Sequence, residues 1–303
     1  MNLFSISQLS QFSGIKPHTI RVWEQRYNAL KPERSEGNTR YYDDSQLRRL
    51  LNIVSLMENG YKVSHLCSLS DENLFSLILN SRQSGTDKSA DYYVNQLISA
   101  GMTYDTLHFE KVFSLCLLDY GLKEAYKMVV YPVMERIGLL WAGDMLPSAN
   151  EHFISNIFRQ KLSAEIDSLP APDRSSETWL LFLPENEFHE LALLYAHFLI
   201  RLSGRKLIYL GSNVPLGSLK SAILDTRPEN LLMFLVHYDM PDQILKNIES
   251  ISSYFTGDRF YLAGNPKLIS RIKYSDQIIY LQSVGQLEEI LGLNESLTNC
   301  SKI

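Results

Sequence analysis

The chain has little cysteine and no long apolar run. Its 303 residues include three cysteines, Cys67, Cys116 and Cys300, which lie far apart and lack metal-type spacing. This spacing indicates neither a disulfide framework nor a zinc ribbon, and it favours a reducing compartment. No apolar stretch is long enough to span a bilayer, and the N-terminus lacks the basic and apolar regions of a secretion signal. We therefore predict a cytoplasmic protein with no membrane partner.

The chain also lacks the overall positive charge that is typical of a protein that binds a polyanion. Its formal net charge is −5, but the charge is unevenly distributed. Residues 1–67 carry nine Lys/Arg and six Asp/Glu, which gives this segment a net charge of +3. The remaining residues carry 20 of the 29 basic and 28 of the 34 acidic residues, which gives them a net charge of −8. We therefore expect the two parts of the chain to face different partners.

Two polar stretches divide the chain into three zones. Residues 80–90 are mostly polar, with three Ser and one Gly, and residues 169–177 contain two prolines among polar residues, which argues against a continuous helix. We therefore predict a multi-domain protein, with an N-terminal domain at residues 1–75, a middle domain at residues 88–168 and a C-terminal domain at residues 176–296.

The middle zone shows helical periodicity, and glycines and prolines interrupt it at few positions. Apolar residues recur at the spacing of a helix at Val112, Leu115, Leu118 and Leu122, and later at Phe153, Ile157 and Leu162. This pattern predicts a small helical bundle.

The C-terminal zone alternates short apolar runs with longer amphipathic segments. The apolar runs are residues 179–183, 207–210, 231–236, 260–262 and 278–281. Five such alternations predict an α/β domain with a doubly wound, Rossmann-like parallel sheet wrapped by helices. Ligands of these sheets bind at the carboxyl ends of the strands. The loops of interest are therefore residues 184–189, 211–215, 237–240 and 263–266.

The first residues carry the signals of two short helices. Ser5 can cap a helix that runs through Leu9 and Phe12, and Gly14 can end it. Pro17 suits the first turn of a second helix. This spacing predicts a helix-turn-helix within about twenty-five residues.

The second helix has two faces of different character. Ile20, Trp23 and Tyr27 share one face, which can pack against the first helix. The other face, which suits a major groove, carries His18, Arg21, Val22 and Gln25. A plain alternative is a solvated helical hairpin that merely exposes arginines.

A polar turn follows the second helix. Arg34, Asn38 and Arg40 lie around Gly37, and Tyr41 and Tyr42 come next. This is the composition of a wing whose cations contact phosphate, and such contacts position a protein without specifying sequence.

The run Ile20–Tyr27, together with the spacing of Arg34, Asn38, Arg40 and Tyr42, closely resembles the recognition helix and wing of the MerR family. The resemblance covers about residues 3–70. It implies a winged helix that binds a double-stranded DNA operator as a homo-oligomer, either a dimer or a tetramer, and a C-terminal domain that senses a signal. The DNA-binding residues it implies are His18, Thr19, Arg21, Arg26, Arg34, Asn38, Arg40 and Tyr42.

The same resemblance assigns Trp23 to the core. The long dimerising helix of many MerR proteins is not evident after Ser70. We therefore expect assembly to depend on the C-terminal domains.

A bundle and a doubly wound sheet behind such a domain resemble the light- and cobalamin-responsive repressors of the CarH/LitR type. Trp141 is followed after nine residues by Glu151 and His152, as in the bundle that covers the upper face of the corrin in that family. Glu187 and His189 lie in the first strand-to-helix loop, where cobalamin domains carry Asp/Glu-x-His-x-x-Gly. The resemblance implies adenosylcobalamin as cofactor, with His189 as the ligand of cobalt and Glu187 orienting its imidazole.

The sequence departs from this family at several places. Ala192 replaces the glycine of the histidine motif, and Ala142 stands where light-sensing relatives carry a histidine, so we do not expect light sensitivity. Val236-His237-Tyr238 is bulky where the family has a small segment that lines the channel of the nucleotide tail. Ala263-Gly264-Asn265 keeps one glycine of a Gly-Gly pair. Within these limits, Ser212 and Gly264 are predicted to complete the cofactor site.

Other functions were weighed against this one. The C-terminal module can instead be free of cofactor and controlled by a partner, such as an antirepressor protein, or by another small ligand. A zinc site at His152, His189 and His197 lacks compact spacing and cysteines. No segment is left over for a catalytic barrel, and no Gly-rich phosphate motif occurs. We therefore predict a repressor-like regulator with a binding module, and not an enzyme.

Overall fold

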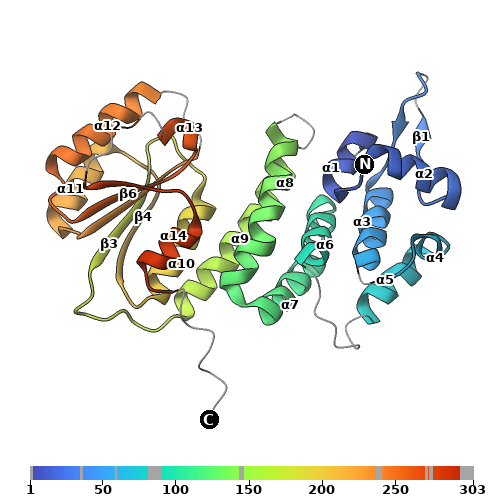
Figure 1. Ribbon diagram of the computed structural model, residues 1–303, viewed down its shortest axis with the longest axis horizontal. Helices are drawn as coiled ribbons and strands as arrows, with labels where there is room; N and C mark the ends of the chain where they lie inside the picture. Colours follow the sequence, from blue (N-terminus) through green and yellow to red (C-terminus); the bar gives the residue numbers. More distant parts are fainter. Residues whose placement is uncertain are drawn as a thin grey trace, which may run out of the picture. The chain divides into compact units, whose positions relative to one another are not determined.

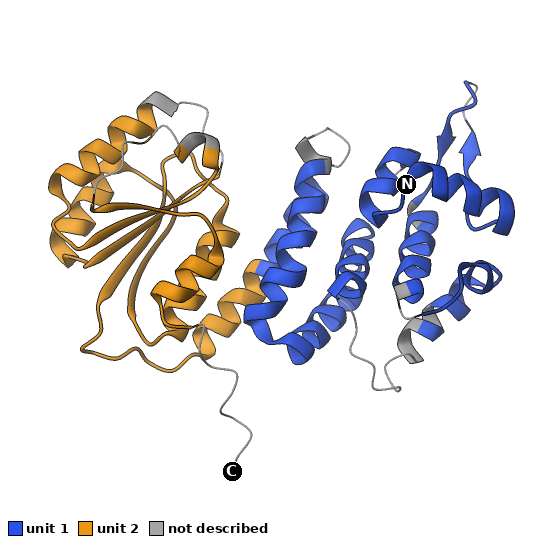
Figure 2. Ribbon diagram, in the orientation of Figure 1, with its two compact units in different colours: residues 1–158 blue, residues 159–303 orange. Residues whose placement is uncertain are grey.

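The computed structural model describes residues 3–34, 37–58, 60–80, 90–142, 147–236, 241–269, 272 and 276–293 (Figure 1). The chain forms two compact units, residues 1–158 and residues 159–303 (Figure 2). This division differs from the three domains expected from the sequence, because the first two of them pack together. Among the described residues, no helix is both long and apolar enough to cross a membrane.

The first unit begins with a winged helix-turn-helix, as predicted. Its elements are α1 (Ile6–Ser13), α2 (Pro17–Tyr27), β1 (Glu33–Arg34), β2 (Arg40–Tyr41) and α3 (Asp44–Glu58). Ser5 and Gln8 form a reciprocal capping box at the start of α1. Gly14 ends α1 with a φ of 72°, which glycine adopts without strain, and Pro17 is the first residue of α2.

The core of this domain comes from one face of each helix. Leu9 and Phe12 of α1 and Ile20 and Trp23 of α2 are buried, whereas Tyr27 is 38% exposed. The packed face of α2 is therefore one turn shorter than predicted. The wing is an antiparallel pair in which Arg34 lies opposite Arg40.

Two short helices, α4 (Val63–Cys67) and α5 (Asp71–Asn80), follow α3. The side chain of Arg49 holds this region together: it donates to the carbonyl oxygens of Ala29, Cys67 and Leu69, and it forms an ion pair with Asp71. In the described part of the chain, α5 is only ten residues long.

The predicted bundle is present, with helices α6 (Ala90–Met102), α7 (Thr106–Ala125), α8 (Tyr131–Ala142) and α9 (Ser148–Ser168). A non-helical Gly121 kinks α7, and a π-helical turn at Tyr126–Val130 leads into α8. The sequence placed Leu118 on the apolar face of α7, but this side chain is 80% exposed. The face of α7 that is buried carries Phe109, Val112, Phe113 and Cys116.

The winged helix and the bundle form one unit because α3 packs against α6, and α1 against α8. The guanidinium of Arg136 reaches from α8 to the carbonyl oxygen of Phe12, at 3.4 Å, and to Asn95 Oδ1, at 3.2 Å. As a result, α6 is buried on every side from Tyr92 to Met102.

The second unit contains the predicted parallel sheet. Its strands are β3 (Thr178–Pro184), β4 (Lys206–Val214), β5 (Asn230–Leu235), β6 (Arg259–Gly264) and β7 (Ile278–Leu281). They pair in the order β4-β3-β5-β6-β7, and all of the pairings are parallel. In this order the chain changes direction between β3 and β5, which is where doubly wound sheets bind their ligands.

Helices cover both faces of this sheet (Figure 1). They are α10 (Glu190–Leu202), α11 (Leu216–Thr226), α12 (Pro241–Tyr254), α13 (Pro266–Ile269) and α14 (Val284–Ile290). Leu180 and Phe182 of β3 join the apolar cluster under α11 and α12, and Trp179 stacks on Tyr261 with ring centroids 5.0 Å apart. Because both faces are covered, the strands are apolar along most of their length.

A candidate DNA-binding surface and a histidine loop

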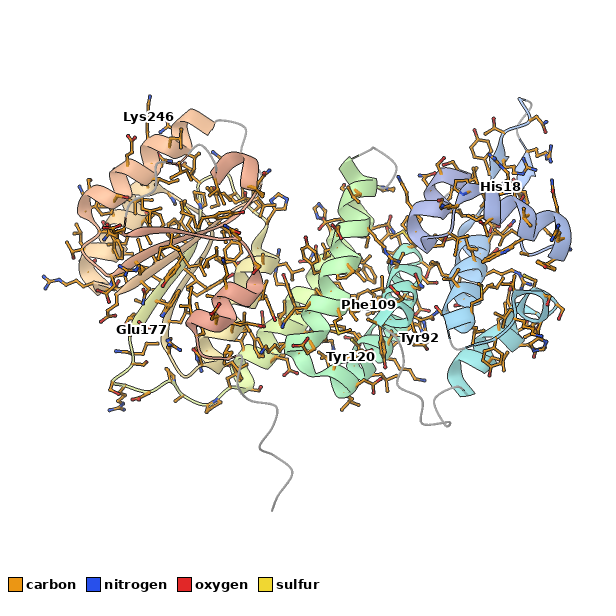
Figure 3. All side chains as sticks on the ribbon, in the orientation of Figure 1. His18, Tyr92, Phe109, Tyr120, Glu177 and Lys246 are labelled. Carbon is orange, nitrogen blue, oxygen red and sulfur yellow. The ribbon has the colours of Figure 1, made fainter. Side chains whose placement is uncertain are left out.

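The outer face of α2 presents most of the predicted contact residues. His18 (Figure 3), Arg21 and Arg26 are exposed, and Thr19 is half-buried. Arg21 and Arg26 make no ion pair within the described residues. The buried Ile20 and Trp23 fix the opposite face of the helix. The helix is therefore anchored by its apolar side and offers cations to solvent, although DNA contact itself stays a prediction.

The wing contributes further cations. Arg34 donates a hydrogen bond to Asn38 Oδ1, and both residues are exposed. Asn38 has a φ of 60°, a conformation that asparagine tolerates better than most residues. Arg40 is 25% exposed, and its Nε lies 3.2 Å from Glu24 Oε2 on α2. The wing is thus tied to the second helix by an ion pair.

Tyr42 does not occupy the position predicted for it. The side chain is fully buried, and its hydroxyl donates to the carboxylate of Glu24. Its backbone pairs with that of Phe4. Burial, together with the hydrogen bond to Glu24, raises the pKa of Tyr42. Tyr42 therefore supports the wing from within, in place of the direct DNA contact that we expected.

Sequence reasoning missed Glu24, which joins Tyr42 and Arg40. Its carboxylate is only 7% exposed although α2 is a surface helix. The available signal was a lone acidic residue among the basic residues of α2, next to the buried Trp23.

The loop between β3 and α10 is built around one buried carboxylate. Glu187 is 1% exposed. Its Oε1 accepts the backbone N–H groups of Phe188, at 3.0 Å, and His189, at 3.1 Å, and its Oε2 accepts that of Val236, at 2.9 Å. The backbone oxygen of Glu187 accepts the N–H of Asn213 at the end of β4. The carboxyl ends of three neighbouring strands therefore hold this loop.

His189 is the side chain that this arrangement positions. Its Nδ1 lies 2.5 Å from Glu187 Oε1, and its side chain is 51% exposed. A carboxylate is an acceptor only, so Nδ1 carries the proton and Nε2 becomes the nitrogen with the lone pair in the neutral ring. A carboxylate behind a histidine is the usual support of a metal-ligating imidazole. The donor set therefore fits a cobalt ligand.

The two other predicted residues of this unit lie on neighbouring strands. Ser212 belongs to β4 and is half-buried. Gly264 ends β6 with a φ of 121°, and a Cβ there would lie 2.1 Å from the carbonyl oxygen of Leu235. The packing of β6 against β5 thus already requires this glycine. A role in holding a ligand stays a prediction for both residues.

The space behind the loop is almost filled. A cavity between the carboxyl ends of β3 and β5 and the helices α11 and α12 measures about 10 Å³, less than a water molecule occupies. Apolar side chains line most of it, including Pro184, Val214 and Met233. His237 and Tyr238, which the sequence predicted to obstruct a nucleotide tail, lie outside the described residues.

The predicted upper-face residues belong to the first unit. Trp141 and Ala142 end α8, but their side chains lie outside the described set. Glu151 and His152 lie near the start of α9, with His152 Nδ1 2.7 Å from Glu151 Oε2. The side chain of His152 is 69% exposed. Contacts of these residues with an adenosyl group stay predictions.

The third histidine considered for zinc has a different environment. His197 stacks on Tyr209 with ring centroids 4.9 Å apart. Burial, together with the nearby Arg201, lowers the pKa of His197 to about 4. Throughout the described ranges, no three His, Cys, Asp or Glu side chains gather so that they could hold a metal ion.

Comparison with known proteins covers both units. Residues 4–69 match the model of the MerR HTH family regulatory proteins. The HTH-type transcriptional repressor CarH of Myxococcus xanthus is 26% identical over 230 residues, which are 75% of this chain and 76% of that protein. The repressor CarA of the same organism is 24% identical over 247 residues, 80% of each chain.

A solved structure matches in fold. The monomethylamine corrinoid protein of Methanosarcina barkeri superimposes with a TM-score of 0.55 and 9% identity, over 68% of this chain and 99% of that one. At this identity the match concerns the fold alone. Residues 4–69 therefore carry a MerR-type HTH domain, and the chain is similar over most of its length to two transcriptional repressors. Its C-terminal module shares its fold with a corrinoid protein.

Proposed function

We propose that this regulator is a DNA-binding repressor whose C-terminal module senses a B12-type corrinoid held by His189. The observation that carries the sensing half is the Glu187–His189 pair, because a buried carboxylate presents an exposed imidazole where sheets of this topology bind ligands. His189 would hold such a corrinoid through Nε2, and the bound corrinoid would supply a cobalt ion that accepts a nitrogen ligand.

The DNA half of the proposal rests on the exposed cations of α2 and the wing. Arg21 and Arg26 face solvent on the helix, and Arg34 does so on the wing. A helix of this kind enters a major groove, while wing cations meet phosphate. The operator is double-stranded DNA, and binding as a homo-oligomer, dimer or tetramer, doubles the contacts on a two-fold symmetric site.

The finer part of the proposal concerns the form of the cofactor. Adenosylcobalamin is the form that we propose, and Trp141, Glu151 and His152 are the residues of the bundle that would hold its adenosyl group. Ligand binding controls DNA affinity through the oligomeric state. Such a ligand shifts operator occupancy only by its differential affinity for the two assemblies.

The test is an absorption spectrum. Full-length protein is incubated with adenosylcobalamin in the dark and desalted, alongside His189→Ala and the control His65→Ala, which removes an exposed histidine from the first unit. Retained corrin, with a spectrum that changes in His189→Ala and not in His65→Ala, supports the proposal. If no corrin elutes with the wild-type protein, the proposed corrinoid sensing is rejected, and the proposed DNA binding is unaffected.

One observation favours a second candidate function. Among the described residues, the cavity behind the loop measures about 10 Å³, which is too small for a nucleotide tail. A C-terminal module without cofactor, controlled by a partner such as an antirepressor protein or by another small ligand, accounts for that closed packing. The same absorption experiment separates the two candidates, because this second one predicts no retained corrin.

A further inference from the structure

The central helix of the bundle buries polar side chains that need partners. Asn95, Gln96 and Ser99 of α6 are at most 4% exposed. Asn95 accepts a hydrogen bond from Arg136. The hydroxyl of Ser99, by contrast, makes no hydrogen bond to any described residue. Its oxygen is not among the fully enclosed side-chain atoms that lack a partner, so it is open to water or to a bound molecule.

A second polar group in the same place is also incomplete. Asn52 of α3 is 5% exposed, and its Oδ1 accepts from Gln96 Nε2 at 3.1 Å. Gln96 is fully used, because Nε2 also approaches Ser55 Oγ and its Oε1 lies 3.1 Å from His108 Nε2. The amide nitrogen of Asn52, however, finds no acceptor among the described residues. Its two N–H groups are donors that remain available.

Both groups line one cavity of about 310 Å³. It lies within the first unit, between α3, α5, α6 and the start of α7, and its size is typical of sites for small ligands. Arg48 and Asn52 are one turn apart on α3, and Ser99 and Thr103 are one turn apart on α6, so two helices contribute a polar stripe each.

The charges around the cavity restrict what it can hold. Arg48 is exposed and makes no ion pair or hydrogen bond within the described residues, so it is available for a carboxylate. Arg49 is already neutralised by Asp71. Glu72 and Asp105 are exposed on the same rim. A ligand with both signs of charge is matched here, whereas a polyanion meets an excess of carboxylates.

We propose that this cavity is a second effector site, which binds an amino-acid-sized zwitterion. Its carboxylate accepts hydrogen bonds from the Asn52 amide, the Ser99 hydroxyl and the Arg48 guanidinium, and its ammonium group faces Glu72 and Asp105. Since α3 belongs to the winged helix and α6 to the bundle, a ligand that contacts both helices fixes the DNA-binding domain on the bundle. The site is independent of His189 and of any corrinoid.

The test uses the full-length protein and a panel of the common amino acids, each at millimolar concentration. At least one of them raises the melting temperature, because a ligand that binds only the folded state stabilises it. Its affinity falls about tenfold in Ser99→Ala and in Arg48→Ala, since each loses a hydrogen bond to a charged group. Ser253→Ala and Lys246→Ala remove a hydroxyl and a cation at exposed positions of the second unit and leave the affinity unchanged.

Amide hydrogen exchange shows where the amino acid binds. The bound amino acid slows exchange in peptides from α3 and α6 and leaves β3 and α10 unaffected. The proposal is overturned if no amino acid shifts the melting temperature, or if the shift persists at full affinity in both cavity variants. If Ser99→Ala does not fold, Arg48→Ala alone decides the outcome. Arg48 is exposed and has no partner among the described residues, so its removal should leave the fold intact.

Discussion

The two units present their candidate functional side chains in opposite ways. On α2, the cations Arg21 and Arg26 are exposed, and apolar packing on the far side of the helix holds them in place. In the second unit, His189 is held by the buried carboxylate of Glu187, which is itself bound to backbone N–H groups of its own loop and of Val236, just after β5. Losing a cation should therefore remove a contact, whereas losing the carboxylate should damage the fold.

Among the substitutions considered for the two units, Glu187→Ala is expected to have the largest effect. Removing the carboxylate leaves the N–H groups of Phe188, His189 and Val236 without their acceptor, and we expect the second unit to lose about 3 kcal/mol of unfolding free energy. Denaturant unfolding checks this. Glu185→Ala, an exposed glutamate of the same loop, is the matched control and should leave stability unchanged. Equal stability of the two variants would contradict the supporting role of Glu187.

The stability of the second unit should also depend on pH through the half-buried His197. The folded pKa of His197 is about 4, below its ordinary value near 6.5, so between these values the unfolded state binds the extra proton. Stability should therefore fall by about 2 kcal/mol as pH drops from 6.5 to 4, allowing for partial exposure to water. Unfolding free energies measured across this range check the slope. His197→Leu should flatten it and His65→Leu should not; an unchanged slope in His197→Leu would reject this assignment.

The first unit should respond to charge removal through DNA affinity alone. Arg21→Ala is expected to weaken binding to duplexes selected from a random library by about tenfold, with unfolding free energy unchanged, because the residue is exposed. If Arg21 contacts phosphate, the dependence of log affinity on log salt also falls by about one unit. Fluorescence anisotropy measures both. Lys246→Ala, an exposed cation of the second unit (Figure 3), serves as control. Wild-type affinity in Arg21→Ala would remove α2 from the interface.

The smallest expected effect concerns Tyr42. Tyr42→Phe loses the hydrogen bond to Glu24 and should cost about 1 kcal/mol of unfolding free energy. Because the side chain is buried, DNA affinity should change less than in Arg21→Ala. Thermal unfolding and anisotropy on the same variant test both statements. A loss of affinity as large as that of Arg21→Ala would restore the direct contact that the sequence predicted.

Local signals in the sequence were sufficient for most of the fold. The cap at Ser5, the helix end at Gly14 and the five apolar runs depend on neighbouring residues, and all of them appear in the structure. The exposure of Leu118 was missed because helical periodicity is consistent with several faces. Only the packing partners of α7 decide which of those faces is buried.

The candidate sites were predictable in part, for a similar reason. His189 and Glu187 were found because they are two residues apart, but the contribution of Val236, forty-nine residues from Glu187, is a backbone contact that no side-chain pattern reveals. Likewise, nothing in the sequence indicated that α3 and α6 pack together and enclose Asn52 and Ser99. Contacts made across long separations were therefore the part that sequence reasoning lacked.

The carboxylate of Glu187 accepts hydrogen bonds from backbone N–H groups, which nearly every amino acid provides. Substitutions at Phe188 or Val236 keep the same N–H donors, unless the newcomer is proline. Phe188 is 61% exposed beside His189, so changes there alter what surrounds the imidazole while its anchorage persists. Single substitutions around His189 can thus change which ligand is bound, while the hydrogen bonds that orient the imidazole stay in place.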